Sequence, residues 1–172
     1  MNTRSIFFAA VAAVAMTSVA TGALAAGSVS TTASASVTIL APMTITKTQD
    51  MAFGQIVRPT NASVNTVILN TTGVVSLTGA GDGSIVSSPT TAAKFDLTAL
   101  PGTTYTTSQV LTFSTTGLTS VAASAPTVKT GTLGTIPPAG VQEIRYGGQF
   151  DMTNVTPVQA YTGTLTVTIN YP

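Results

Sequence analysis

Residues 28–39 read SVSTTASASVTI, and this N-terminal stretch decides how the rest of the chain is interpreted. Its even positions hold only serine and threonine. Its odd positions hold mostly apolar side chains: Val29, Thr31, Ala33, Ala35, Val37 and Ile39. Successive side chains of a strand point to opposite faces, so the stretch predicts a strand with one apolar edge and one hydroxyl edge. Such a strand requires a groove to cover it, and we expect that groove to belong to another copy of the protein.

The composition excludes several classes of function. The chain has 172 residues, of which 44% are hydrophobic, so we expect one folded domain with a core rather than a disordered tail. Only 6% are charged and the net charge is +1, which is too little for a basic nucleic-acid-binding face. Cysteine and histidine are absent, which removes disulfides, thiolate nucleophiles and the commonest general base and metal ligand. We therefore expect no enzyme and no metal or cofactor.

The first 25 residues are typical of a secretory signal peptide. Arg4 precedes an apolar run at residues 6–19, and residues 23–25 (ALA) form a small-x-small cleavage site. The run is shorter than the roughly 20 residues that a membrane span requires. Cleavage after Ala25 removes Arg4 and leaves five basic and five acidic side chains. We expect an exported protein without a membrane span, first in the periplasm and then at the cell surface.

Beyond the signal we expect an N-terminal arm at residues 26–36 and a β-sandwich domain at residues 37–172. The predicted strands cover residues 37–47, 51–57, 64–69, 74–78, 84–87, 94–100, 110–114, 127–133, 141–146, 149–153 and 161–171. Residues 118–126 are expected to form a loop, and Tyr105 to stand alone as a boundary aromatic. No window shows a sustained period of 3.6 residues, and many short strands bounded by turn residues favour an antiparallel sandwich.

The last predicted strand, residues 161–171, has the cleanest alternation of the domain. Threonine and asparagine alternate there with Leu165, Val167, Ile169 and Tyr171, and we expect these four to line the edge of the acceptor groove. An exposed edge of this kind promotes aggregation unless another strand covers it. Val29, Val37 and Ile39 would then be the large plugs, and Ala33 and Ala35 would need shallow pockets. Tyr161 is predicted to anchor a corner of the sandwich.

Other signals are weaker. Residues 79–83 (GAGDG) contain the glycines of a phosphate loop but lack the lysine and the following helix, so they indicate a turn. Asp50, Asp82 and Asp151 are potential Ca²⁺ ligands, but their spacing does not match an EF-hand, and solvated acids explain them better.

Both ends of the chain resemble one known family. Residues 33–57 (ASASVTILAPMTITKTQDMAFGQIV) and 147–171 (GGQFDMTNVTPVQAYTGTLTVTINY) resemble the start and end of the DUF4402 family of exported bacterial proteins. The closing motif is also similar to spore-coat-protein-U-like subunits, which belong with archaic chaperone–usher pilins.

The resemblance implies an immunoglobulin-like sandwich that lacks its last strand. It further implies a periplasmic chaperone that fills the gap first and an outer-membrane usher that assembles the subunits. The arm of the next subunit then replaces the chaperone, and a head-to-tail contact of this kind forms a filament.

One alternative arrangement remains open. The N-terminal stretch can instead fold back and complete its own domain, because the same alternation fits both arrangements. The protein would then be a self-contained secreted or surface sandwich that binds a carbohydrate or a protein partner.

Overall fold

The computed structural model describes residues 27–87 and 89–171, so the expected signal peptide lies outside the described residues. Chain contacts divide the molecule into two units, with the boundary between Val37 and Thr38. The described residues form twelve strands and no helix, which confirms the all-β prediction. Residues 27–43 hold no strand, so the first strand begins at Thr44 and not at residue 37 as expected.

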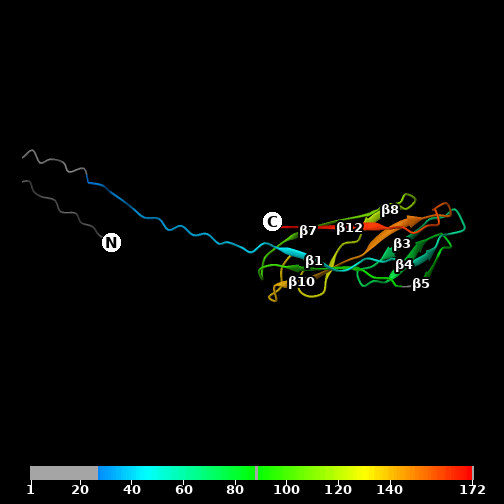
Figure 1. Ribbon diagram of the computed structural model, residues 1–172, viewed down its shortest axis with the longest axis horizontal. Helices are drawn as coiled ribbons and strands as arrows, with labels where there is room; N and C mark the ends of the chain where they lie inside the picture. Colours follow the sequence, from blue (N-terminus) through cyan, green and yellow to red (C-terminus); the bar gives the residue numbers. More distant parts are fainter. Residues whose placement is uncertain (1–26, 88, 172) are drawn as a thin grey trace, which may run out of the picture. The chain divides into compact units, whose positions relative to one another are not determined.

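The second unit contains a four-stranded antiparallel sheet with the order β1-β6-β10-β9. Its strands are β1 (Thr44–Gln49), β6 (Ala93–Thr98), β10 (Val141–Tyr146) and β9 (Thr127–Val128). Leu97, Ile144 and Tyr146 point inward from this sheet and are almost fully buried. They pack against β12 (Gly163–Asn170), which pairs along its whole length with β7 (Thr106–Phe113). Figure 1 shows β12, in red, beside β7.

A second four-stranded sheet has the order β4-β3-β11-β8. Its strands are β4 (Val75–Gly79), β3 (Asn65–Leu69), β11 (Gly148–Met152) and β8 (Thr119–Ala123). A small ladder joins β2 (Gln55–Val57) to β5 (Ser84–Ser87). Val67, Phe150 and Met152 form the buried part of the second core, with Phe53 and Phe113 packed against them. Two apolar layers facing each other across these cores make the fold a β-sandwich.

A single residue separates β10 from β11 and lets the chain pass from one sheet to the other. A Cβ atom on Gly147 would lie 2.1 Å from the carbonyl oxygen of Leu69, so only glycine fits there. The residues before it pair with β6, and those after it pair with β3. Gly147 therefore marks the crossing between the two sheets.

Two further expectations about the domain are wrong, besides the start of the first strand. Residues 119–123, expected as a loop, form β8, because they pair with β11 at the edge of the second sheet. Tyr105, expected as a boundary aromatic, is buried, and its hydroxyl donates to Oε1 of the fully buried Gln142 at 2.5 Å. The Gln142 amide in turn donates to the carbonyl oxygens of Thr130 and Thr132, at 3.1 Å each. Tyr105 thus belongs to a satisfied polar network inside the first core.

Two buried phenols give a prediction about alkaline stability. Burial raises the pKa of Tyr105 and of Tyr146, whose hydroxyl is 2.6 Å from the Oγ1 atom of Thr107. In the unfolded chain both ionise near their ordinary pKa of about 10. The contribution of these two phenols to the free energy of unfolding should therefore be complete below that pH, and it should decrease as the pH rises toward their native pKa values. Urea unfolding at pH 9 and pH 11 measures the decline.

A matched control separates these phenols from the rest of the molecule. The double variant Tyr105→Phe and Tyr146→Phe should be less stable at pH 9 but should lose less further stability between pH 9 and pH 11. An equal decline in both proteins would contradict the assignment to these two residues.

Candidate functional site: an uncovered groove between two edges of the sandwich

The second unit contains an elongated groove of about 1530 Å³. Residues 47–60, which include β2, form one side of it, and we call them the first lip. Residues 154–165, which lead into β12, form the other side, and we call them the second lip. Apolar side chains from β6, β7 and β11 line the groove between the lips: Ala93, Phe95, Leu111, Phe113, Phe150 and Met152.

The inner face of β1, beside the groove, lacks the cover that the rest of its sheet has. Ile45 lies directly opposite Leu97 in the β1–β6 ladder, and directly opposed residues of a ladder share one face. Leu97 is 1% exposed, whereas Ile45 is 39% exposed. The sheet opposite therefore covers β6 but stops short of β1. An extra strand beside β12 would lie over this uncovered edge.

The second lip is shaped by a turn and a corner. The Thr156 hydroxyl accepts a bond from the Thr153 backbone nitrogen at 2.9 Å and fixes the turn that ends β11. The Tyr161 hydroxyl donates to the carbonyl oxygen of Pro157 at 2.8 Å, four residues upstream, which is the tyrosine corner that the sequence predicted. From this corner the chain enters β12, whose only ladder among the described residues is with β7. The other edge of β12 faces the groove side of the sandwich and has no strand partner in the described part of the chain.

Hydrogen bonds join the two sides of this gap near both of its ends. Arg58 Nη1 donates to the carbonyl oxygen of Thr156 at 2.5 Å, which links the first lip to the second lip. Beyond the end of β12, the Tyr171 hydroxyl donates to the carbonyl oxygen of Ala41 at 3.0 Å. The two links show that β1 and β12 run in opposite directions along the gap. A strand inserted between them is parallel to one and antiparallel to the other.

Three aromatic rings pack together under the middle of the groove. The Phe53 ring meets Phe150 edge-on with centroids 5.1 Å apart, and Phe113 meets Phe150 in the same way at 5.7 Å. Phe53 comes from the first lip, Phe113 from β7 and Phe150 from β11. Edge-to-face pairs of this kind are worth about 0.5–1.5 kcal/mol beyond their buried area. The middle of the groove therefore has a rigid apolar floor.

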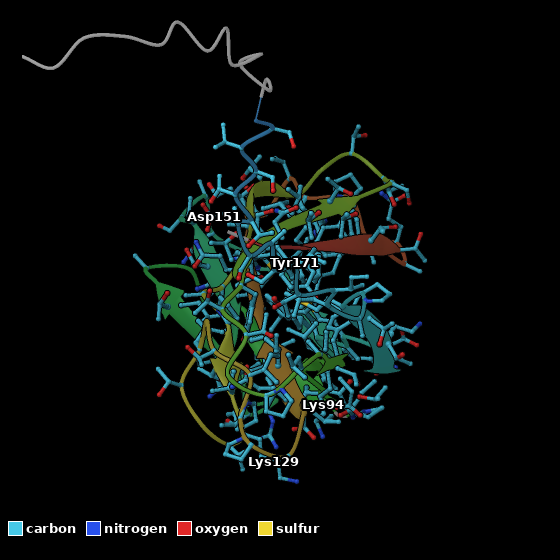
Figure 2. All side chains as sticks on the ribbon, turned by 90° about the vertical axis from the view of Figure 1, so that its left-hand side faces the viewer. Lys94, Lys129, Asp151 and Tyr171 are labelled. Carbon is cyan, nitrogen blue, oxygen red and sulfur yellow. The ribbon has the colours of Figure 1, made fainter. Side chains whose placement is uncertain are left out.

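Charged groups are unevenly distributed around the sandwich. Lys94, Asp96, Glu143 and Arg145 face outward from β6 and β10, where the Arg145 side chain holds the pKa of Glu143 below its usual range. Figure 2 shows Lys94 and Lys129 toward one side of the domain. By contrast, β7 and β12 contain no charged residue, and their outer positions are mainly threonine and serine. The outer surface beside the groove thus has the same character as the hydroxyl edge of residues 28–39.

The structure locates each residue that sequence analysis placed in the assembly site. Residues 27–42, which include Thr31, Ala33, Ala35 and Val37, are exposed, with Val29 at 100% and Ile39 at 90%. Leu165 lines the groove, and Val167 and Ile169 lie half-buried against the first core. Tyr171 is an exposed end residue that bonds to Ala41. No local pattern in the sequence indicates the first lip or Arg58, because only the topology shows which strand edge is left uncovered.

The residues considered as metal ligands are not brought together. Asp50 pairs with Lys47, Asp151 accepts the Thr66 hydroxyl, and Asp82 accepts two backbone N–H groups and the Thr60 hydroxyl. The Thr60 hydroxyl is the main cause that lowers the pKa of Asp82. The described residues contain no cluster of three acidic, histidine or cysteine side chains placed to bind a metal. No helix in the described part of the chain has the length and apolar character of a membrane span.

Comparison with known proteins gives one match. No curated protein and no protein of solved structure matches the chain. A family model described as "Domain of unknown function (DUF4402)" matches residues 43–171, which is most of the chain and nearly all of the second unit. The protein therefore belongs to the DUF4402 family.

Proposed function

We propose that this protein is a structural subunit of a bacterial surface filament, assembled by insertion of residues 28–39 of one copy into the groove of the next. The observation that supports this most directly is the uncovered inner face of β1 beside the groove, where Ile45 is exposed although its ladder partner Leu97 is buried. A strand is needed to cover this face of β1, and residues 28–39 of a second copy have a suitable length and alternation. A head-to-tail contact that does not close on itself yields a filament.

The length and the alternation of residues 28–39 both support this stretch as the occupant of the groove. β12 has a free edge of eight residues, and the N-terminal stretch of twelve residues, about 40 Å when extended, is long enough to pair along all of it. In β12 the inward side chains are apolar and the outward ones are threonine or asparagine, as in the stretch itself. A strand added beside β12 would put its apolar edge over the core and its hydroxyl edge beside the threonines. Backbone bonds would give affinity and the alternating side chains specificity.

The exposed apolar side chains of residues 28–39 supply the driving force for insertion into the groove. Val29, Val37 and Ile39 are all largely exposed in the single chain. Burying a side chain of this size contributes about 1.5–3 kcal/mol. Until a second copy arrives, the open edge and apolar floor are an aggregation hazard. A periplasmic chaperone that lends a strand, and an outer-membrane usher that organises the exchange, complete the proposal.

Electrophoresis of extracted material with and without boiling tests the proposed function. Strands inserted in this way should survive detergent at room temperature, so the unboiled sample should show a ladder of multimers and the boiled sample a single band. The competing arrangement, in which residues 28–39 complete their own domain, gives one monomer band in both lanes. That result would overturn the proposal and favour a self-contained surface sandwich.

A further inference from the structure

A single ion pair lies on the lip of the otherwise largely apolar groove. Lys47 lies directly opposite Phe95 in the β1–β6 ladder and therefore faces the groove, not the outer surface. Its ammonium nitrogen is 2.6 Å from Oδ1 of Asp50, and the two side chains are 56% and 80% exposed. An inward-pointing charge on an edge strand is a device that natural sheets use to prevent wrong pairing. At this point β1 also has a bulge, between Lys47 and Gln49.

The N-terminal stretch has a corresponding gap in its row of plugs. Ala33 and Ala35 are its smallest inward side chains, and Val29, Val37 and Ile39 lie on either side of them. We call Ala33 and Ala35 the alanine gap. A larger side chain in this position would have to displace the Lys47 stem and remove water from its charged head, which is costly. An alanine leaves the lysine hydrated and paired with Asp50.

The two features can be aligned by residue spacing, since all strands rise by nearly the same distance per residue. In an antiparallel register with Ile39 over Met43, just before β1, Ala35 falls over Lys47, because both pairs are four residues apart and β1 is regular up to Lys47.

From this match we infer that Lys47, held by Asp50, acts as a size filter in the groove and admits only the alanine gap of an incoming stretch. The inference rests on the proposed function and adds to it the residue that determines which strand is accepted. It also explains why the stretch contains alanines where larger plugs would bury more surface. Lys47 is a specificity residue of the acceptor, and its partner residues belong to a second copy of the chain.

A double-mutant cycle in the full chain tests the inference. Filling the gap with Ala33→Leu and Ala35→Leu should lower the yield of unboiled multimers by about tenfold, the effect of modest overpacking. Adding Lys47→Ala to the filled chain should restore the yield to within about threefold of wild type, since the obstruction is gone. Lys129→Ala, an exposed lysine outside the groove, should not restore it. Val74→Ile, which enlarges an exposed side chain outside the groove, should leave the yield unchanged.

The outcomes separate this inference from the function on which it rests. A wild-type chain that forms no multimers would overturn both. A wild-type chain that forms multimers, together with a filled chain that forms them equally well, would overturn the size filter alone. A filled chain that stays deficient after Lys47→Ala would also overturn it, because the obstruction would then lie elsewhere in the groove. Circular dichroism of each variant shows whether the domain is still folded.

Discussion

Deleting residues 28–36 is expected to abolish the multimer ladder and to leave a folded monomer. The deletion removes Val29 and most of the backbone that would pair with the free edge of β12, while the second unit, which begins at Thr38, keeps all its strands. The multimer yield on unboiled gels should fall to background. The far-ultraviolet circular dichroism of the purified monomer should remain that of a β protein. A truncated chain that still polymerises would show that another segment links the copies.

A variant of unchanged length and composition sharpens this experiment. Exchanging Val29 with Ser30 and Val37 with Thr38 moves two plugs to the hydroxyl edge while Ile39 keeps its place, so no single face can bury all three. The exchanged chain should lose most of its multimers although its stretch is as long and as apolar as before. By contrast, Ser30→Thr and Ser34→Thr change only the hydroxyl edge and should have no effect. Equal loss in both variants would contradict the role of alternation.

Strict local patterns predicted their strands well. Residues 84–87 and 141–146 are strands with the expected bounds, and the alternation at 161–171 predicted β12 to within two residues at its start. These segments combine β-branched side chains with clear turn residues on either side, so local preference and tertiary pairing agree. The tyrosine corner could also be predicted, because Tyr161 stands just before the last strand and four residues after Pro157.

The failures occur where pairing and not pattern decides the structure. Residues 37–43 keep apolar side chains at every odd position, yet they form no strand, because no neighbouring strand pairs with them in the described chain. Residues 119–123 (TSVAA) lack a strict alternation, yet they form β8 because β11 offers them an edge. Strand formation depends on cross-strand neighbours at least as much as on intrinsic preference.

The same distinction between local pattern and strand pairing applies to the candidate site. The sequence could predict that Leu165 belongs to a strand with one apolar face, and the structure places this residue on the second lip of the groove. It could not predict the first lip, because residues 47–60 are an ordinary strand and turn until the β1–β6 register shows that Ile45 and Lys47 face an uncovered side. The inward position of Lys47 likewise depends on the register and not on any feature of its own segment.

Blocking the groove should be as damaging as removing the stretch that fills it. Leu165→Lys places a charge on the second lip, where the inserted strand would have to bury it against the apolar floor, and burying an unpaired charge is very costly. In the single chain the same lysine can extend into water along the open groove. We expect a folded monomer whose multimer yield falls to background. Thr166→Lys, one residue further on and exposed on the outer face, is the matched control and should assemble.

The two defective chains should complement each other in one direction only. The chain deleted for residues 28–36 retains a groove, and the Leu165→Lys chain retains residues 28–39, so a mixture of the two should form dimers that cannot grow further. Native mass spectrometry of the mixture, with the two chains distinguished by mass, should find one copy of each per dimer and no homodimers. Head-to-tail insertion requires this result, because each contact uses the stretch of one copy and the groove of another. Homodimers of either chain, or heteromers larger than two, would show that a different surface joins the copies.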